Sequence, residues 1–139
     1  MHIRPFTIKD KPALIELWKR CGLTRPWNDA EKDIERKLAV QSHMFLVGLV
    51  GDRMVASVMA GYDGHRGWVN YLAVCPSTQR RGYGRKLMQH AEDLLRQAGC
   101  PKINIQIRSD NEDVIEFYRS LDYSMDKVVS MGKRLQRDD

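Results

Sequence analysis

The sequence predicts an α/β protein (α+β in some classifications), with a mixed central sheet that holds one parallel strand pair and about four flanking helices. Residues 68–74, 84–98 and 102–107 have the patterns of a strand, an amphipathic helix and a second strand. A helical crossover between two strands makes them parallel, with a right-handed connection. Turn signals at Gly51-Asp52 and Asp63-Gly64 predict antiparallel hairpins ahead of this unit.

Two helices are expected before the first hairpin. Asp10 can cap the first helix, whose first turn tolerates Pro12, and Gly22 ends it. The apolar residues of this helix fall on one face: Ala13, Leu14, Leu17, Trp18 and Cys21. Asn28, with Glu31 three residues later, resembles a capping box and predicts the start of the second helix.

The remaining elements are predicted from apolar runs and from the turn and cap residues that bound them. Residues 45–50 and 54–61 are apolar and supply the strands of the first hairpin. A last helix is expected at 112–121, capped by Asp110 or Asn111, and a final strand within 124–135. Because there is no repeat, low-complexity tract or linker, residues 1–139 are expected to form a single domain.

Composition predicts a cytoplasmic protein with neither membrane spans nor metal. The chain is 42% hydrophobic and 29% charged, and no apolar run approaches the roughly 18 residues that a membrane helix needs. Residues 1–5 lack the apolar stretch of a signal peptide. The cysteines, Cys21, Cys75 and Cys100, are odd in number and lack metal-ligand spacing, and the histidines are scattered. No disulfide framework or metal site is therefore expected.

Basic residues are concentrated before the long helix. The net charge of +5 fits a solvated basic surface, a nucleic-acid partner or a polyanionic small molecule. Four basic residues lie between positions 80 and 86, and Gly82 and Gly84 expose the backbone N–H groups beside them. With the positive end of the helix dipole, this loop is an anion site suited to a pyrophosphate. A basic turn that merely starts a helix has the same pattern. The loop is not a dinucleotide fingerprint, because Leu87 occupies the third glycine position.

Three blocks of sequence resemble the GNAT superfamily of acetyltransferases. Residues 79–84, Gln-Arg-Arg-Gly-Tyr-Gly, are similar to its pyrophosphate loop, and residues 72–74, Leu-Ala-Val, to its coenzyme strand. Asn111 followed by residues 117–123 resembles its Asn…Tyr-x-x-x-Gly-Phe helix. The resemblance covers the whole chain and is most specific over 70–123. Three further segments look like those of the bacterial YpeA-type acetyltransferases: residues 25–29, 61–67 and 132–135.

The resemblance implies an N-acetyltransferase that uses acetyl-CoA as co-substrate and acetylates a primary amine of a small molecule or peptide by direct attack. It implies that a set of loop residues binds the coenzyme phosphates: Gln79, Arg80, Arg81, Gly82, Gly84 and Arg85. The backbone of Leu72 and Val74 would pair with the pantetheine arm, and an N–H near Val74 would stabilise the developing oxyanion. Asn111 and Tyr118 would contact the coenzyme, and the Tyr118 hydroxyl would protonate the departing thiolate.

Several of these residues have structural alternatives. Tyr118 also fits the core-facing stripe of its helix, and Asn111 also fits a helix cap. Cys75 has no histidine nearby in sequence, so we expect a buried structural thiol and no covalent acyl-enzyme. The Trp27 segment either lines an acceptor pocket or forms a hydrophobic staple.

The general base is the least defined part of the prediction. Related ribosomal-protein N-terminal acetyltransferases place a glutamate where this chain has Gln106, which cannot accept a proton. Possible substitutes, acting directly or through water, are Asp63, His65, Asp110 and Glu112.

Two other functions compete with acetyl transfer. A non-catalytic coenzyme-A-binding or sensor domain on the same fold is the main alternative, because of Gln106. Nucleic-acid binding is not expected, because the densest basic cluster is one short loop.

A homodimer is expected, because only one good strand, near Val128 and Val129, fits in the 18 residues after Leu121 (139 − 121), and an early sheet edge needs covering.

Overall fold

The computed structural model describes residues 1–138, which contain five β-strands and four α-helices. These residues divide into two compact units. The first contains residues 1–105 together with Asp138, and the second contains residues 106–137.

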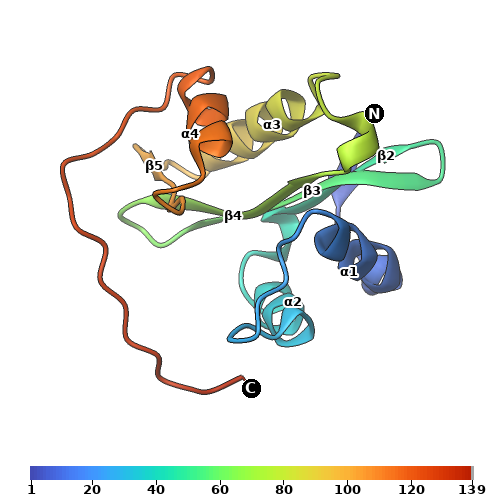
Figure 1. Cartoon of the computed structure of the whole chain (residues 1–139), viewed down its shortest axis with the longest axis horizontal. Helices are drawn as coiled ribbons and strands as arrows, with labels where there is room; N and C mark the ends of the chain where they lie inside the picture. Colours follow the sequence, from blue (N-terminus) through green and yellow to red (C-terminus); the bar gives the residue numbers. More distant parts are fainter. Residues whose placement is uncertain (139) are drawn as a thin grey trace. The chain divides into compact units, whose positions relative to one another are not determined.

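The first unit is built on a five-stranded sheet whose strands lie side by side in chain order. The strands are β1 (His2–Pro5), β2 (Phe45–Val50), β3 (Arg53–Tyr62), β4 (Gly67–Val74) and β5 (Ile103–Asn104). Neighbouring strands are antiparallel except β4 and β5, which are parallel (Figure 1). The predicted mixed sheet with one parallel pair is confirmed. The sequence prediction missed β1, whose four residues are too few to show an alternation.

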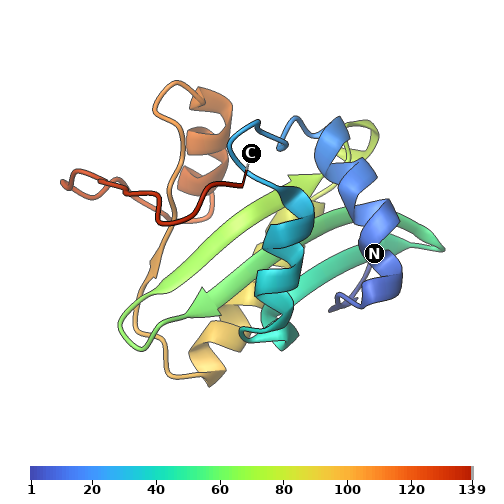
Figure 2. The same ribbon diagram turned by 90° about the horizontal axis from the view of Figure 1, so that it is seen from below.

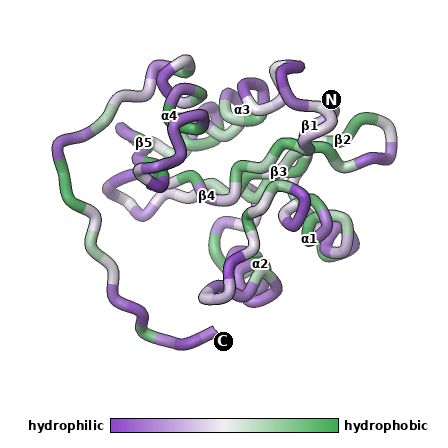
Figure 3. The backbone as a smooth tube through the Cα atoms, in the orientation of Figure 1, coloured by the Kyte–Doolittle hydropathy of each residue, from purple (hydrophilic) through white to green (hydrophobic). Residues whose placement is uncertain are grey.

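Helices cover both faces of this sheet. The first two helices, α1 (Lys11–Arg20) and α2 (Ala30–Leu38), lie on one face, and α3 (Tyr83–Gln97) lies on the other (Figures 1 and 2). The buried apolar side chains of α1 and α3 are Leu14, Leu17 and Trp18 in α1, and Leu87, Met88, Ala91 and Leu95 in α3. They fit the predicted amphipathic pattern, except that Ala13, expected on the apolar face of α1, is exposed. Hydrophobic residues are densest along β2 and β3 (Figure 3), where they form the centre of the core.

The N-terminal caps differ in detail from the prediction. Asp29 caps α2 by accepting a hydrogen bond from Lys32 N (3.1 Å), so the predicted cap at Asn28 is wrong by one residue. Asp10 precedes α1 as predicted, but its carboxylate caps no N–H of α1. It binds the Arg4 guanidinium (2.7 and 2.9 Å) and accepts from Thr7 N (2.8 Å) in the turn before the helix. This ion pair lowers the pKa of Asp10 and ties β1 to the start of α1.

Side chains from the α2 region replace a strand partner along part of β3. The pairing of β2 with β3 stops at Met59, which leaves the next backbone groups of β3 without a partner strand on that side. The Gln41 amide binds both Tyr62 N (2.8 Å) and Tyr62 O (2.9 Å), and Lys37 donates to Ala60 O. Burial lowers the pKa of Lys37. These bonds satisfy the edge of β3 and hold the end of α2 against it.

A β-bulge at Tyr71 is the main irregularity of the sheet. Between the pairs Ser57↔Ala73 and Met59↔Asn70, β4 has two residues where β3 has one. Tyr71 adopts a left-handed backbone conformation (φ +53°), which a non-glycine residue adopts only when neighbouring groups hold it. The hydroxyl of buried Ser57 donates to Tyr71 O (3.4 Å) and accepts from Trp18 Nε1 (3.0 Å), and the Trp18 ring stacks on the Tyr71 ring (4.0 Å between centroids).

The strand β5 is shorter than predicted. Residues 102–107 were expected to be extended and paired, but only Ile103 and Asn104 pair with β4, opposite Gly67 and Trp68. The predicted length is therefore wrong. β5 ends opposite Trp68, before β4 reaches its bulge at Tyr71.

The second unit contains one helix and an extended C-terminal stretch. The helix α4 (Glu112–Arg119) is capped by Asn111, whose side chain accepts from Val114 N (3.4 Å), so the cap reading of Asn111 is confirmed. The final strand predicted within 124–135 is wrong, because none of these residues is in a strand. Val128 and Val129 are 77% and 87% exposed, and apolar alternation alone makes no strand without a neighbour to pair with.

The hydrogen bonds of Ser57 beneath the bulge lead to a prediction about stability. In Ser57→Ala, the buried Trp18 Nε1–H loses its acceptor, and Tyr71 O loses a donor. We expect the free energy of unfolding to fall by about 1–3 kcal/mol. Urea unfolding measures this change. Ser124→Ala, at an exposed serine, is the matched control and should change stability by less than about 0.5 kcal/mol. Equal stability of the two variants would contradict the role of Ser57.

Candidate functional site

The loop that follows β4 folds back onto the end of its own strand. Residues Pro76–Thr78 form a 3-10 turn in which Thr78 Oγ1 donates to Cys75 O (3.0 Å). Gln79, one of the predicted loop residues, donates from Nε2 to Val74 O (3.2 Å). The loop is therefore fixed at the end of β4, directly before the start of α3.

The start of α3 has the features of an anion site. Gly82 is its N-cap residue in a left-handed conformation (φ +78°), and no side chain caps the helix. A Cβ atom built on Gly82 would meet no protein atom within 4 Å, so a ligand can approach the backbone there. The neighbouring basic side chains are exposed: Arg80, Arg81, Arg85 and Lys86. The dipole of a 15-residue helix adds partial positive charge at the same point.

Within residues 1–138, no strand pairs with the edge of β4 beside this loop. Cys75 N donates to Val55 O on β3 (2.7 Å), so in the antiparallel ladder the N–H and C=O of Val74 point to the opposite side. On that side, β5 pairs only with Gly67 and Trp68. Leu72 and Val74, both predicted from the sequence, therefore lie on an unpaired edge that ends at the anion site.

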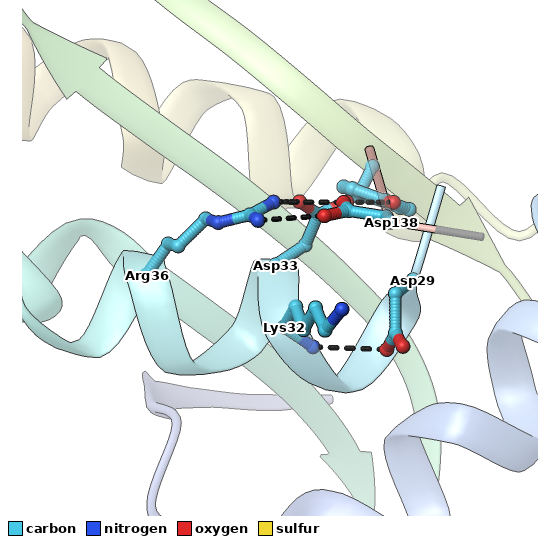
Figure 4. A network of polar contacts seen from close by, with 6 residues as sticks. Asp29, Lys32, Asp33, Arg36 and Asp138 are labelled. Atoms are coloured by element: carbon cyan, nitrogen blue, oxygen red, sulfur yellow. Dashed lines mark hydrogen bonds and ion pairs between the residues drawn. The ribbon is translucent and has the colours of Figure 1, made fainter. Parts of the chain in front are cut away.

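A polar network joins the bulge of β4 to α2. The Tyr71 hydroxyl donates to Asp33 Oδ2 (2.6 Å), and Asp33 Oδ1 accepts from Arg36 (3.2 Å). Arg36 also binds both carboxylate oxygens of Asp138 (2.9 and 2.8 Å; Figure 4). Burial and the Asp33 carboxylate raise the pKa of Tyr71, and the Arg36 guanidinium lowers that of Asp138 to about 2.

Sequence reasoning missed this network. Tyr71 has the appearance of an ordinary strand aromatic, and Asp33 and Arg36 that of a solvated helix face. The contact between Arg36 and Asp138 spans 102 positions, and no local pattern predicts such a pair.

Two of the predicted substitute bases lie away from the anion site. The Asp63 carboxylate accepts hydrogen bonds from His65 N (2.8 Å) and Arg66 N (2.7 Å), and these bonds lower its pKa. Asp63 and His65 thus form the hairpin turn before Gly67, and β4 separates them from Val74 by roughly 23 Å at about 3.3 Å per residue. Both residues shape the turn.

The second unit holds the other predicted residues. Tyr118 is 5% exposed and packs edge-on against Phe117 and Tyr123, and burial raises the pKa of its hydroxyl. A tyrosine hydroxyl is protonated at neutral pH without this shift, and the raised pKa makes it a weaker acid. Gln106 donates from its amide to the Ser130 hydroxyl. Asp110 and Glu112 flank the Asn111 cap and are exposed.

Cys75 is buried, as the sequence predicts. Its thiol lies near the hydroxyl of Ser77 (3.3 Å) and the guanidinium of Arg53 (3.5 Å). The Ser77 contact, more than the charge of Arg53, lowers the pKa of Cys75. Arg53, which the sequence did not single out, also donates to Ser77 (3.1 Å) and braces the loop.

No helix within residues 1–138 is long and apolar enough to cross a membrane.

Comparison with known proteins identifies related sequences and folds. The family model described as "Acetyltransferase (GNAT) family" matches residues 11–123. An acetyltransferase of Sodalis glossinidius is 49% identical over 139 residues, which cover 99% of this chain and 98% of that protein.

Solved structures share the fold at lower identity. An aminoglycoside antibiotic 6'-N-acetyltransferase from Acinetobacter haemolyticus has a TM-score of 0.78 and 22% identity, covering 98% of this chain and all (100%) of its own. A ribosomal-protein alanine N-acetyltransferase from Escherichia coli has a TM-score of 0.71 and 24% identity, covering 86% of this chain and 75% of its own.

Proposed function

Since the chain belongs to the GNAT family of acetyltransferases, we propose that it transfers the acetyl group of acetyl-CoA to a primary amine of a small molecule or peptide by direct attack. One observation carries this proposal. The unpaired edge of β4 ends at a glycine loop where basic side chains and a helix N-terminus converge. A pyrophosphate with an amide-containing arm matches both parts of this surface.

The loop binds the coenzyme phosphates in this proposal. Arg80, Arg81 and Arg85 neutralise phosphate charge, and Gly82 and Gly84 let the backbone approach the pyrophosphate. Gln79 holds the loop against Val74. Along β4, the backbone of Leu72 and Val74 pairs with the pantetheine arm as a strand would. Val74 contributes its N–H, because Gln79 and Cys21 already bind its C=O.

Catalysis then needs three contributions from the chain. The Val74 N–H stabilises the oxyanion that develops on the thioester carbonyl. Tyr118 donates its proton to the departing thiolate, and Asn111 contacts the coenzyme from its cap position. An alkylamine has a pKa near about 10.4 and must lose a proton before it attacks. Asp63 and His65 belong to the hairpin turn before Gly67, so Asp110 and Glu112 are the remaining candidates for the general base.

A non-catalytic coenzyme-A-binding or sensor domain is the second candidate. The observation that favours it is Gln106, whose amide is engaged with Ser130 where related enzymes carry a glutamate. A screen of purified protein separates the two candidates. Acetyl-CoA is mixed with aminoglycosides, polyamines, amino acids or peptides, and free thiol is measured. Thiol release that needs an amine supports the enzyme; coenzyme binding without release for any amine class supports the sensor.

We also propose that residues 1–139 work as one cytoplasmic domain that forms a homodimer and binds no nucleic acid. The apolar side chains of the second unit support the dimer, because Val128, Val129 and Met131 are 77–92% exposed in the described structure and need covering. Light scattering at micromolar concentration should give about twice the 16.1 kDa chain mass. A fully active monomer would exclude the dimer.

Gly82→Val tests the phosphate loop. A β-branched side chain over the backbone at Gly82 should block the phosphates and weaken acetyl-CoA binding by at least about tenfold in calorimetry. Gly64→Val is the matched control, because Gly64 also has a positive φ (+95°) and open space at Cβ but lies in the distant hairpin turn. Both positions have a positive φ, which a β-branched residue disfavours. Unchanged affinity in Gly82→Val would remove the loop assignment.

Tyr118→Phe tests the proton donor. The change keeps the ring contacts and deletes the hydroxyl, so turnover should fall by about 10²-fold or more. Acetyl-CoA affinity and the melting temperature should change little. Tyr123→Phe, in the same aromatic cluster, serves as the control and should keep its turnover. If Tyr118→Phe lowers stability but leaves turnover intact, Tyr118 is a core residue.

A further inference from the structure

The first turn of α2 holds a carboxylate that comes from the far end of the chain. The Arg36 guanidinium donates two hydrogen bonds to Asp138, at 2.9 and 2.8 Å, and the backbone N–H of Asp29 donates a third. Lys32 adds a favourable charge. The Asp138 side chain is only 1% exposed in this arrangement, which Figure 4 shows in close view.

These contacts differ from those of an ordinary surface ion pair. A single exposed pair contributes little, because solvent screens it and both side chains lose freedom. Here a planar fork matches both carboxylate oxygens, and a main-chain N–H at a helix N-terminus completes the set. The ion pair of Arg96 with Asp93 on α3, by contrast, joins side chains that are 70% and 65% exposed. The Arg36 group therefore has the chemistry of a carboxylate receptor.

This receptor is connected to the strand proposed to hold the thioester. Asp33 fixes the Arg36 fork through Oδ1 and accepts the Tyr71 hydroxyl through Oδ2. Tyr71 directly precedes Leu72 in the bulge of β4. Two side-chain hydrogen bonds thus link the carboxylate site to the coenzyme strand, and all of these residues belong to the first unit.

We propose that Arg36, with the Asp29 N–H and Lys32, is the subsite for a carboxylate of the acceptor, and that the chain's own Asp138 fills it when no acceptor is bound. The inference rests on the proposed function and narrows its substrate class. The acceptor is an amine that also carries a carboxylate, as amino acids and peptides do. A tethered carboxylate acts at an effective concentration on the order of millimolar, so Asp138 competes with the acceptor.

Binding of a matched pair of probes tests this subsite without requiring turnover. The probes are 6-aminohexanoate and 6-aminohexanamide, which share the amine and differ only in the carboxylate. Each is titrated into full-length protein labelled with nitrogen-15, and the Arg36 Nε signal is followed. In Asp138→Ala, the acid should bind at least about tenfold more tightly than the amide, and about tenfold more tightly than it binds wild type.

Further variants assign the effect to Arg36. Adding Arg36→Gln to Asp138→Ala should abolish the preference for the acid, followed there through the Asp29 N–H signal. In the same Asp138→Ala background, Arg36→Lys keeps the charge but loses the planar fork, so only part of the preference for the acid should remain. Arg96→Gln is the matched control on α3 and should change nothing. Melting temperatures confirm that each variant is folded.

Three results would overturn the proposal. These are equal binding of acid and amide by Asp138→Ala, an acid preference that survives Arg36→Gln, and wild-type affinity equal to that of Asp138→Ala. Any of them would mean that Arg36 only tethers the end of the chain. Calorimetry with acetyl-CoA on the same proteins distinguishes failure of the subsite from failure of the proposed function. Normal coenzyme affinity without an acid preference rejects the subsite alone, whereas loss of coenzyme binding in wild type rejects the proposed function.

Discussion

The separation of β4 from β5 is the constraint on which the rest of the site depends. The two parallel strands pair at only two positions, and the bulge at Tyr71 turns the next residues of β4 away from a regular ladder. Because buried Ser57 and Trp18 hold the bulge from beneath, the core itself fixes this irregularity. It leaves backbone groups unpaired at the end of β4, where the basic loop begins. A closed ladder would have left no edge for the pantetheine arm in the proposed function.

The same bulge organises the opposite face of the sheet. The Tyr71 backbone is held by Ser57 on β3, whereas its side chain reaches α2 through Asp33. The short Tyr71–Asp33 hydrogen bond therefore joins the proposed coenzyme strand to α2, and the stacking of Tyr71 on Trp18 joins the same strand to α1. In the proposed function, this coupling holds the acceptor side and the thioester side in one frame, which is the positioning that direct attack requires.

Local signals predicted what depends on local chemistry. The turn at Gly51-Asp52 and the helix α3 follow from backbone preference and apolar period, and both are confirmed. The cap at Asn28 was wrong by one residue because Asp29 satisfies the same N–H groups. The predicted final strand failed because a strand needs a partner, which its own sequence does not supply. The Tyr71–Asp33–Arg36–Asp138 network joins residues far apart in the chain, so only the folded structure shows it.

Amide hydrogen exchange along β4 tests the central claim most directly. In the free protein, the Val74 N–H lies on an edge that no strand covers. Saturating acetyl-CoA should slow exchange at Val74 by at least about tenfold, because the thioester carbonyl accepts a hydrogen bond from its N–H. The neighbouring amide of Cys75, which already donates to Val55 O, should stay as protected as before. Unchanged exchange at Val74 in a saturated complex would show that the coenzyme binds elsewhere and would contradict the account.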